Sequence, residues 1–428
     1  MSCKFTKNGD QFMSPSYYRP FEIHFIRGIL SILLALAMAW SSGEGLSTQT
    51  VLHVPKHYPT IQAAIDAAPQ GATILVEGAY KVYYENLTIK KSLRLQAKDK
   101  PVVIRGQKRD TPTITITSDV PIQVMLEYFQ AFQDANQFCI SIGGKAQVLL
   151  KNQHVYAGYE AHGGIWIGGL AHLTLQDAVL SSSLLSDGLF VDSSATADII
   201  NTRISGTGAG GIFVRGTAKA NLLGSTISGY GVGIRLMGSA QVAVQDSVIG
   251  GNDWGIQLLE LRKGYLPTVT LENSQVSGNE IGIEVTVLSR GHLKLVNSQV
   301  SSNRQSGIYL GGEGTAELQH SLVLGNGTDP GCKSRPAPPF ECIWSGIVVF
   351  EKARLKLSST EIRGNAYWGL TANLQQCGFV SNSFWGEVIF EDDKNIIEGN
   401  NRLGKLNGMG NPGHHPFKNL PDGQVCLP

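Results

Sequence analysis

Four charged residues, Asp187, Arg235, Asp253 and Glu284, lie in or directly before short segments that repeat along the sequence. They are the residues from which a catalytic group could be assembled. A lyase would need acidic Ca²⁺ ligands and a basic residue near the proton that it removes. A glycoside hydrolase would need two carboxylates facing one cleft, roughly 5 to 9.5 Å apart. Glu160, Asp187, Asp253 and Glu280 lie in the loops before the strands, but the sequence cannot place any two of them face to face. No catalytic set is therefore assigned, and no metal and no cofactor are expected. A Ca²⁺ ion is expected only if the protein is a lyase.

A second set of residues could bind a sugar polymer. Each stands two positions after the glycine of one repeat, and the set is Trp166, Phe190, Phe213, Arg235, Gln257, Glu284 and Tyr309, followed by Val348 and Thr371. The three aromatic residues predict a ladder under successive sugar rings, and the polar residues beyond them could bind hydroxyls or carboxylates. The alternative is that the aromatic rings stack only to stabilise the surface.

These positions are set by a recurring glycine that precedes Ile or Leu, as in "GNDWGIQL". The aligned glycines are Gly164, Gly188, Gly211, Gly233, Gly255, Gly282, Gly307, Gly346 and Gly369, at intervals of 22 to 27 residues with one interval of 39. Each period contains three very short strands, which cannot form a stable sheet alone. Stacked in register, they pair in parallel with the next period and fill a continuous core. The sequence therefore predicts an all-β, right-handed parallel β-helix of about 10 to 12 rungs.

Two further columns are predicted to be structural. Asn, Asp and Gly tolerate left-handed backbone, as a sharp corner requires, and this column holds Asp177, Asn201, Gly224, Asp246, Asn273 and Asn297, then His320 and Ser359. Small residues follow directly, at Ala178, Thr202, Ser225, Ser247, Ser274, Ser298, Ser321 and Thr360. A third turn is marked by Asn252, Asn279, Asn303 and Asn365, for which we expect the same role.

The N-terminal end of the repeats predicts a cap. "YPTIQAAIDAAPQG" (58–71) reads as a short amphipathic helix with Thr60 as its N-cap, and strands follow at "TILVEG", "NLTIKKSLRLQA" and "PVVIRG". With "GAY" (78–80), these residues resemble the N-terminal cap and first rungs of the pectin lyase-like superfamily, especially pectinesterases and periplasmic β-helix repeat proteins. The resemblance implies the fold and a groove over the outer face of the Gly-Ile strands. It carries no catalytic set across, because Ser186-Asp187-Gly188, Ala161-His162-Gly163 and Asp329-Pro330-Gly331 only partly match the superfamily's enzyme motifs.

Export is predicted by the apolar run Ile29 to Trp40, which follows Arg27 and ends in a small-x-small cleavage pattern. With 35 Lys plus Arg against 34 Asp plus Glu, the chain has no global attraction for nucleic acid or an anionic membrane. A membrane is expected to be contacted only through the signal. The predicted parts are a signal peptide at 1–39, a linker at 40–50, a cap with the first rungs at 51–110, repeats at 111–380 with an insertion at 325–344, and an irregular C-terminal cover at 381–428.

The cysteines of an exported chain are candidates for disulfides. Cys332 and Cys342 bracket a Pro-rich loop, and Cys377 and Cys426 bracket the C-terminal tail, so these are the predicted pairs. Cys139 occupies an apolar strand position and is predicted to be a buried thiol.

Three functions agree with these features. The favoured one is an exported, monomeric, enzymatically silent protein that binds carbohydrate or another envelope polymer along the Gly-Ile face. The second is a polysaccharide lyase or glycoside hydrolase with an unfamiliar catalytic set, and the third is a structural surface spacer or adhesin.

Overall fold

The structure is a computed structural model that describes residues 50–427, with gaps at 79–80, 99–100, 184–185, 261, 263, 287–288, 329–344, 373–385, 409 and 412–419. Residues 49–428 form one compact unit. The predicted signal segment, most of the insertion at 325–344, and Cys332, Cys342 and Cys377 lie outside the described residues. None of the described residues forms an apolar helix of membrane-spanning length.

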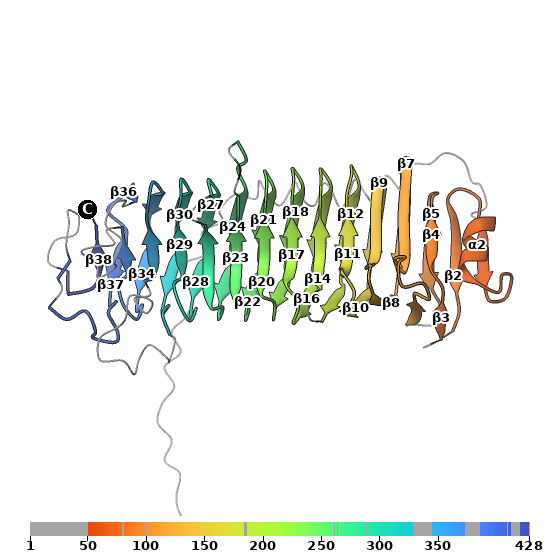
Figure 1. Cartoon of the computed structure of the whole chain (residues 1–428), viewed down its shortest axis with the longest axis horizontal. Coiled ribbons are helices and arrows are strands. Elements are labelled where there is room, and N and C mark those ends of the chain that lie inside the picture. The colour runs from red at the N-terminus through yellow and green to blue at the C-terminus, as the bar shows by residue number, and fades with distance from the viewer. Residues whose placement is uncertain are drawn as a thin grey trace, which may run out of the picture. The chain divides into compact units, whose positions relative to one another are not determined.

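The described chain winds through about 12 turns of a parallel β-solenoid, with three rows of stacked strands and one short helix. Figure 1 shows the strands following one another along the long axis, with α2 at the red N-terminal end. Every strand pair in the register is parallel, as the repeats predict. The first row, which contains the Gly-Ile strands, is β4 (Leu87–Ile89), β11 (Gly163–Ile167), β14 (Asp187–Val191), β17 (Gly210–Val214), β20 (Val232–Leu236), β23 (Trp254–Leu258), β26 (Ile281–Val285), β29 (Ile308–Leu310), β32 (Ile347–Val349), β35 (Leu370–Thr371) and β38 (Val425–Cys426).

The second row joins the first through two long strands, β7 (Ile114–Glu127) and β9 (Phe138–Lys151), which run across both. The remaining strands of the second row are β1 (Val51–Val54), β2 (Ala72–Val76), β5 (Leu93–Ala97), β12 (His172–Gln176), β15 (Thr196–Ile200), β18 (Lys219–Leu223), β21 (Gln241–Gln245), β24 (Thr268–Glu272), β27 (His292–Val296), β30 (Thr315–Gln319), β33 (Arg354–Ser358) and β36 (Glu387–Phe390).

The third row is a separate sheet of 13 strands. They are β3 (Val82–Tyr84), β6 (Val102–Arg105), β8 (Phe129–Ala135), β10 (His154–Glu160), β13 (Val179–Ser182), β16 (Arg203–Gly206), β19 (Thr226–Ser228), β22 (Val248–Gly250), β25 (Gln275–Ser277), β28 (Gln299–Ser301), β31 (Leu322–Leu324), β34 (Glu361–Arg363) and β37 (Ile396–Glu398).

The predicted inward residues of the first row form one continuous stack. All are fully buried, and they are Ile165, Leu189, Ile212, Ile234, Ile256, Ile283, Ile308, Ile347 and Leu370. Neighbours in this series are register partners, from Ile165 with Leu189 to Ile347 with Leu370. This confirms the glycine-based alignment and fixes which residues of each Gly-Ile strand point away from the core.

The predicted turn columns are structural. The corner column has left-handed backbone throughout, with φ values between +47° and +59°. In the small-residue column that follows, hydroxyl oxygens accept backbone N–H bonds from the rung before, as Ser274 Oγ does from Ser247 N at 3.2 Å. The asparagines of the third turn form a buried ladder, which extends through Asn326 and Asn400 to Gln424. The sequence alignment missed these last three members.

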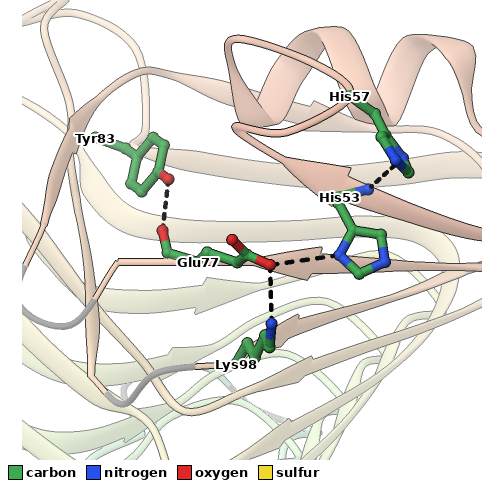
Figure 2. A network of polar contacts seen from close by, with 5 residues as sticks. All are labelled: His53, His57, Glu77, Tyr83 and Lys98. Atoms are coloured by element: carbon green, nitrogen blue, oxygen red, sulfur yellow. Dashed lines mark hydrogen bonds and ion pairs between the residues drawn. The ribbon is translucent and has the colours of Figure 1, made fainter.

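The cap helix is present as α2 (Ile61–Ala67), and Thr60 Oγ1 accepts the backbone N–H of Ala63 at 3.1 Å. A polar network joins the first rungs beside it (Figure 2). Lys98 Nζ and His53 Nδ1 lie 3.0 Å and 3.5 Å from Glu77 Oε1, and the Tyr83 hydroxyl donates to the Glu77 carbonyl at 2.7 Å. The Lys98 and His53 contacts lower the pKa of Glu77. This network links β1, β2 and β3 and fits a structural role at the cap.

Nonreducing peptide mapping is expected to link Cys332 to Cys342 and Cys377 to Cys426 and to leave Cys139 unlinked. Cys139 is a fully buried free thiol, and its burial raises its pKa, so it is neither exposed nor reactive. Cys426 is disulfide-bonded, while its predicted partner lies outside the described residues. A peptide that joined Cys139 to any other cysteine would contradict this assignment.

Candidate functional site

The outward residues of the first row form one column across successive strands. Register pairing joins Trp166 to Phe190, Phe190 to Phe213, and Phe213 to Arg235. It continues through Gln257 and Glu284 to Tyr309. These seven side chains are partly exposed. Val348 and Thr371 continue the column but are 3% and 0% exposed, so the exposed part of the predicted surface ends at Tyr309.

The aromatic stack differs from the predicted one in its first member. Phe190 and Phe213 are stacked with ring centroids 4.8 Å apart, as expected. Their third partner is Phe138, whose ring is nearly parallel to Phe190 at 6.2 Å. The Trp166 ring instead lies over Gly168, where an added Cβ would come within 2.4 Å of it. The stack therefore consists of Phe138, Phe190 and Phe213. Phe138 takes the place in the stack that the sequence predicted for Trp166.

Gly163 makes room for Phe138. Phe138, Gly163 and Asp187 start three neighbouring strands and occupy one column, so a side chain at Gly163 would stand between the other two. An added Cβ there would lie 2.7 Å from the Phe138 ring. Because Gly163 has no side chain, the ring can lie beside Phe190. The Arg215 guanidinium covers another part of Phe190 at 5.1 Å and is paired with Asp192 at 2.7 Å.

The polar half of the column is connected by hydrogen bonds. Arg235 Nε donates to Gln257 Oε1 at 3.2 Å, and Gln257 Nε2 donates to Glu284 Oε2 at 2.8 Å. The row thus passes from aromatic rings to a cation, an amide and a carboxylate, and ends at Tyr309. Burial, together with Glu284, raises the pKa of Tyr309 to about 12, so its hydroxyl keeps its proton.

Asp187 lies beside the aromatic stack in an unusual environment for a carboxylate. The backbone N–H of Gly210 is hydrogen-bonded to it, and an added Cβ at Gly210 would lie 2.8 Å from Asp187 Oδ1. Burial raises the pKa of Asp187 to about 6, although Arg235 and the Gly210 N–H act in the opposite direction. Asp187 can therefore change its protonation state near neutral pH.

The other acidic candidates do not join Asp187. Asp253 is exposed and lies three strands further along the row, which at about 4.8 Å per strand is roughly 14 Å away. Glu280 is held by Arg304 at 3.1 Å and by Gln305 at 2.6 Å, and Glu160 is paired with Arg109. Of the acidic candidates, Asp187 has a pKa that Arg235 affects, whereas Glu284 is connected to Arg235 through Gln257.

The second row carries a shallow depression of about 420 Å³. His292, Thr315 and Glu317 line it together with Arg354, Lys356 and Glu387. Ion pairs cross it, including Arg354 with Glu387 at 2.9 Å. Its charged groups already have partners, which fits a solvated face. In the described part of the chain, no group of three His, Cys, Asp or Glu side chains could hold a metal ion.

Comparisons with known protein families and solved structures agree with the parallel β-helix fold. Residues 163–326 match the family model described as "Right handed beta helix region". A search of curated proteins finds no match. The periplasmic alginate epimerase AlgG is 12% identical with a TM-score of 0.51, and the alignment covers 82% of this chain and 83% of that chain.

Two further solved structures are similar at lower TM-scores. Pectate lyase Pel9A is 16% identical with a TM-score of 0.35, covering 75% of this chain and 80% of its own. The Dettilon tailspike protein is 12% identical with a TM-score of 0.45, covering 86% and 75%. At such low sequence identities, the similarity to these structures shows the fold alone. The chain is a right-handed parallel β-helix protein.

Proposed function

We propose that this is an exported protein that binds a carbohydrate polymer along the first row without altering it. The observation that carries the proposal is the continuous, partly exposed column from the Phe190–Phe213 stack through Arg235, Gln257 and Glu284. Flat rings provide stacking area for sugar rings, and the groups beyond them offer donors and acceptors at the regular spacing of the strands. A repeating polymer is the ligand that can use such a regular row at several points.

Export is supported by the apolar run at 29–40 and its cleavage pattern. The structurally similar alginate epimerase AlgG is a periplasmic protein. An extracytoplasmic location gives this chain access to envelope polymers, and we propose that it acts there.

A lyase or hydrolase is the second candidate, and Asp187 is the observation that favours it. A carboxyl whose pKa is about 6 is suited to proton transfer near neutral pH. Against this, Asp253 lies roughly 14 Å from Asp187 by strand spacing, and Glu160 and Glu280 are held by other residues, Glu160 by Arg109 and Glu280 by Arg304 and Gln305. We therefore expect a polysaccharide panel to show binding with no release of unsaturated or reducing ends. Robust depolymerisation by the wild-type protein would favour the enzyme.

A Phe213→Ala variant is expected to bind the polymer about 1 to 3 kcal/mol more weakly, on the scale of stacking on aromatic side chains. The Phe213 ring is partly exposed, so the melting temperature of the variant should differ little from that of the wild type. Titration calorimetry and thermal melting on the same samples measure both effects.

Tyr84→Ala is a matched control, because Tyr84 is 55% exposed but belongs to the third row. The Tyr84→Ala variant should bind the polymer as tightly as the wild type does.

Trp166→Ala should weaken binding less than Phe213→Ala, because the Trp166 ring lies over Gly168. If Phe213→Ala lowers melting and leaves binding intact, the stack is structural and the proposed function is wrong.

A further inference from the structure

Arg235 has binding capacity that the protein itself does not use. Its Nε is bonded to Gln257, while its terminal nitrogens have no carboxylate within ion-pair distance among the described residues. Many surface arginines are paired with acids, as Arg215 is with Asp192 and Arg304 with Glu280. Within the described part of the chain, Arg203, Arg262 and Arg402 are unpaired like Arg235 but lie away from the aromatic stack. Arg235 follows the Phe190–Phe213 stack directly, so a ring on that stack would present its substituents to the guanidinium. An arginine with unpaired nitrogens is suited to hold a carboxylate through two parallel hydrogen bonds.

Asp187 interacts electrostatically with Arg235 and could oppose such a ligand, while Glu284, two strands beyond Arg235, is hydrogen-bonded to Gln257. Asp187 starts the strand that carries Phe190, and Arg235 is on the second strand after it. The two side chains interact electrostatically without forming an ion pair. The backbone N–H of Gly210 is hydrogen-bonded to the Asp187 carboxyl, whose Oδ1 lies over Gly210. A negative charge at Asp187 would repel a carboxylate at Arg235, whereas a neutral carboxyl would not.

We propose that Arg235 and Asp187 form a subsite for a carboxylate group of the polymer, and that this group binds well only when the Asp187 carboxyl carries a proton. The inference rests on the proposed function of the same surface and adds to it the class of ligand, an acidic polysaccharide, and a dependence on pH. Binding of each such group at this subsite takes up one proton from solution when Asp187 starts ionised. The proton remains on the Asp187 carboxyl.

The direction of the pH effect follows from proton uptake. The pKa of Asp187 is raised to about 6, so above that pH the free protein must gain a proton before it binds. Affinity should fall by up to about tenfold for each pH unit above 6 and level off below it. The effect disappears if the ligand is neutral, because a neutral group does not favour the protonated carboxyl.

Each of the other titratable groups around Asp187 is neutral, is paired with a group of opposite charge, or can be tested with a control variant. Tyr230, which precedes β20, has its hydroxyl bonded to Ser182 at 2.9 Å and a pKa raised to about 12 by burial, so it stays neutral. Asp192 and Arg215 neutralise each other at the far ends of β14 and β17. His162, on the turn before β11, packs against Phe138 at 6.1 Å. Histidine is the side chain type that ordinarily changes charge between pH 5 and 8, so His162→Gln is a necessary control.

The test measures affinity by titration calorimetry from pH 5 to pH 8. The probe is the polysaccharide that binds most tightly in the panel, in its carboxylated form and after reduction of its carboxylates to alcohols. The wild type should bind the carboxylated form at least tenfold more tightly at pH 5 than at pH 8 and the reduced form equally at both. Asp187→Asn keeps an oxygen to accept the Gly210 N–H, and it should bind the carboxylated form at pH 8 as the wild type does at pH 5. His162→Gln and Asp253→Asn should retain the wild-type pH dependence.

Arg235→Gln should weaken binding of the carboxylated form tenfold or more and have little effect on the reduced form. The inference is overturned if the tightest polysaccharide is neutral, if Asp187→Asn leaves the pH dependence unchanged, or if His162→Gln abolishes it. In each of these cases polymer binding by the first row can still stand, because Phe213→Ala tests it with the reduced form. Absence of binding to every polysaccharide at both pH values removes the proposed function and the inference together.

Discussion

An Asn303→Ala variant is expected to lose about 2 to 6 kcal/mol of unfolding free energy, more than any other substitution proposed for this chain. Asn303 is fully buried, and its Oδ1 accepts both the backbone N–H of Asn279 at 3.0 Å and Asn279 Nδ2 at 3.1 Å. Its own Nδ2 donates to Asn326 Oδ1 at 2.9 Å. Removing the side chain leaves two buried donors of Asn279 without this acceptor, and each such group costs roughly 1 to 3 kcal/mol. Urea denaturation and thermal melting measure the loss.

Asn221→Ala provides the matched control. Asn221 is exposed, and its amide makes one side-chain hydrogen bond, to Asp198 at 2.7 Å. Replacing it should change stability by no more than about 0.5 kcal/mol, as for ordinary surface substitutions. Equal losses in the two variants would mean that the buried asparagine ladder contributes no more than a surface contact, contrary to the role that its burial implies.

Much of the fold could be predicted because its determinants are local and repeated. The glycine before each apolar residue set the register of the first row, and Ile212 and Ile283 stack inward as that register requires. Residues that tolerate left-handed backbone, such as Asn273 with φ of +48°, marked the corners. Asn326 was missed because it begins an insertion that lengthens its repeat, although its hydrogen bonds to Asn303 and Asn365 are those of the other ladder members.

The site was less predictable because its geometry depends on neighbours in adjacent strands. The sequence places Trp166 and Phe190 at equivalent positions, yet Trp166 turns toward Gly168 and Phe138 takes the place beside Phe190. Phe138 precedes the aligned glycines, and only its pairing with Gly163 shows that its ring has room there. The burial of Asp187 also results from packing across strands, so the sequence could name Asp187 as a candidate without predicting its raised pKa.

An Asp187→Asn variant is expected to be more stable than the wild type at pH 8 and of similar stability at pH 4. The pKa of Asp187 rises from the reference value of 3.8 to about 6 in the folded protein, chiefly because burial disfavours the charged form. Between these two values the folded state binds more protons than the unfolded state, so wild-type stability falls as pH rises through this window. This loss of stability is complete once the pH is above the pKa of Asp187 in the folded protein. About two pKa units correspond to at most roughly 3 kcal/mol, and partial solvent exposure makes the effect smaller.

The measurement is the difference in unfolding free energy between Asp187→Asn and the wild type, taken by urea denaturation from pH 4 to pH 8. Taking the difference removes the contributions of all other titrating groups, because both proteins share them. The amide keeps an oxygen that can accept the Gly210 N–H, so the substitution removes the charge with little change in shape. Asp253→Asn, which removes a carboxylate at an exposed position on the same row, is measured in parallel as the control. A difference for Asp187→Asn that does not depend on pH would show that the Asp187 carboxylate is well solvated in the folded protein, and would remove the physical basis for a proton-dependent subsite.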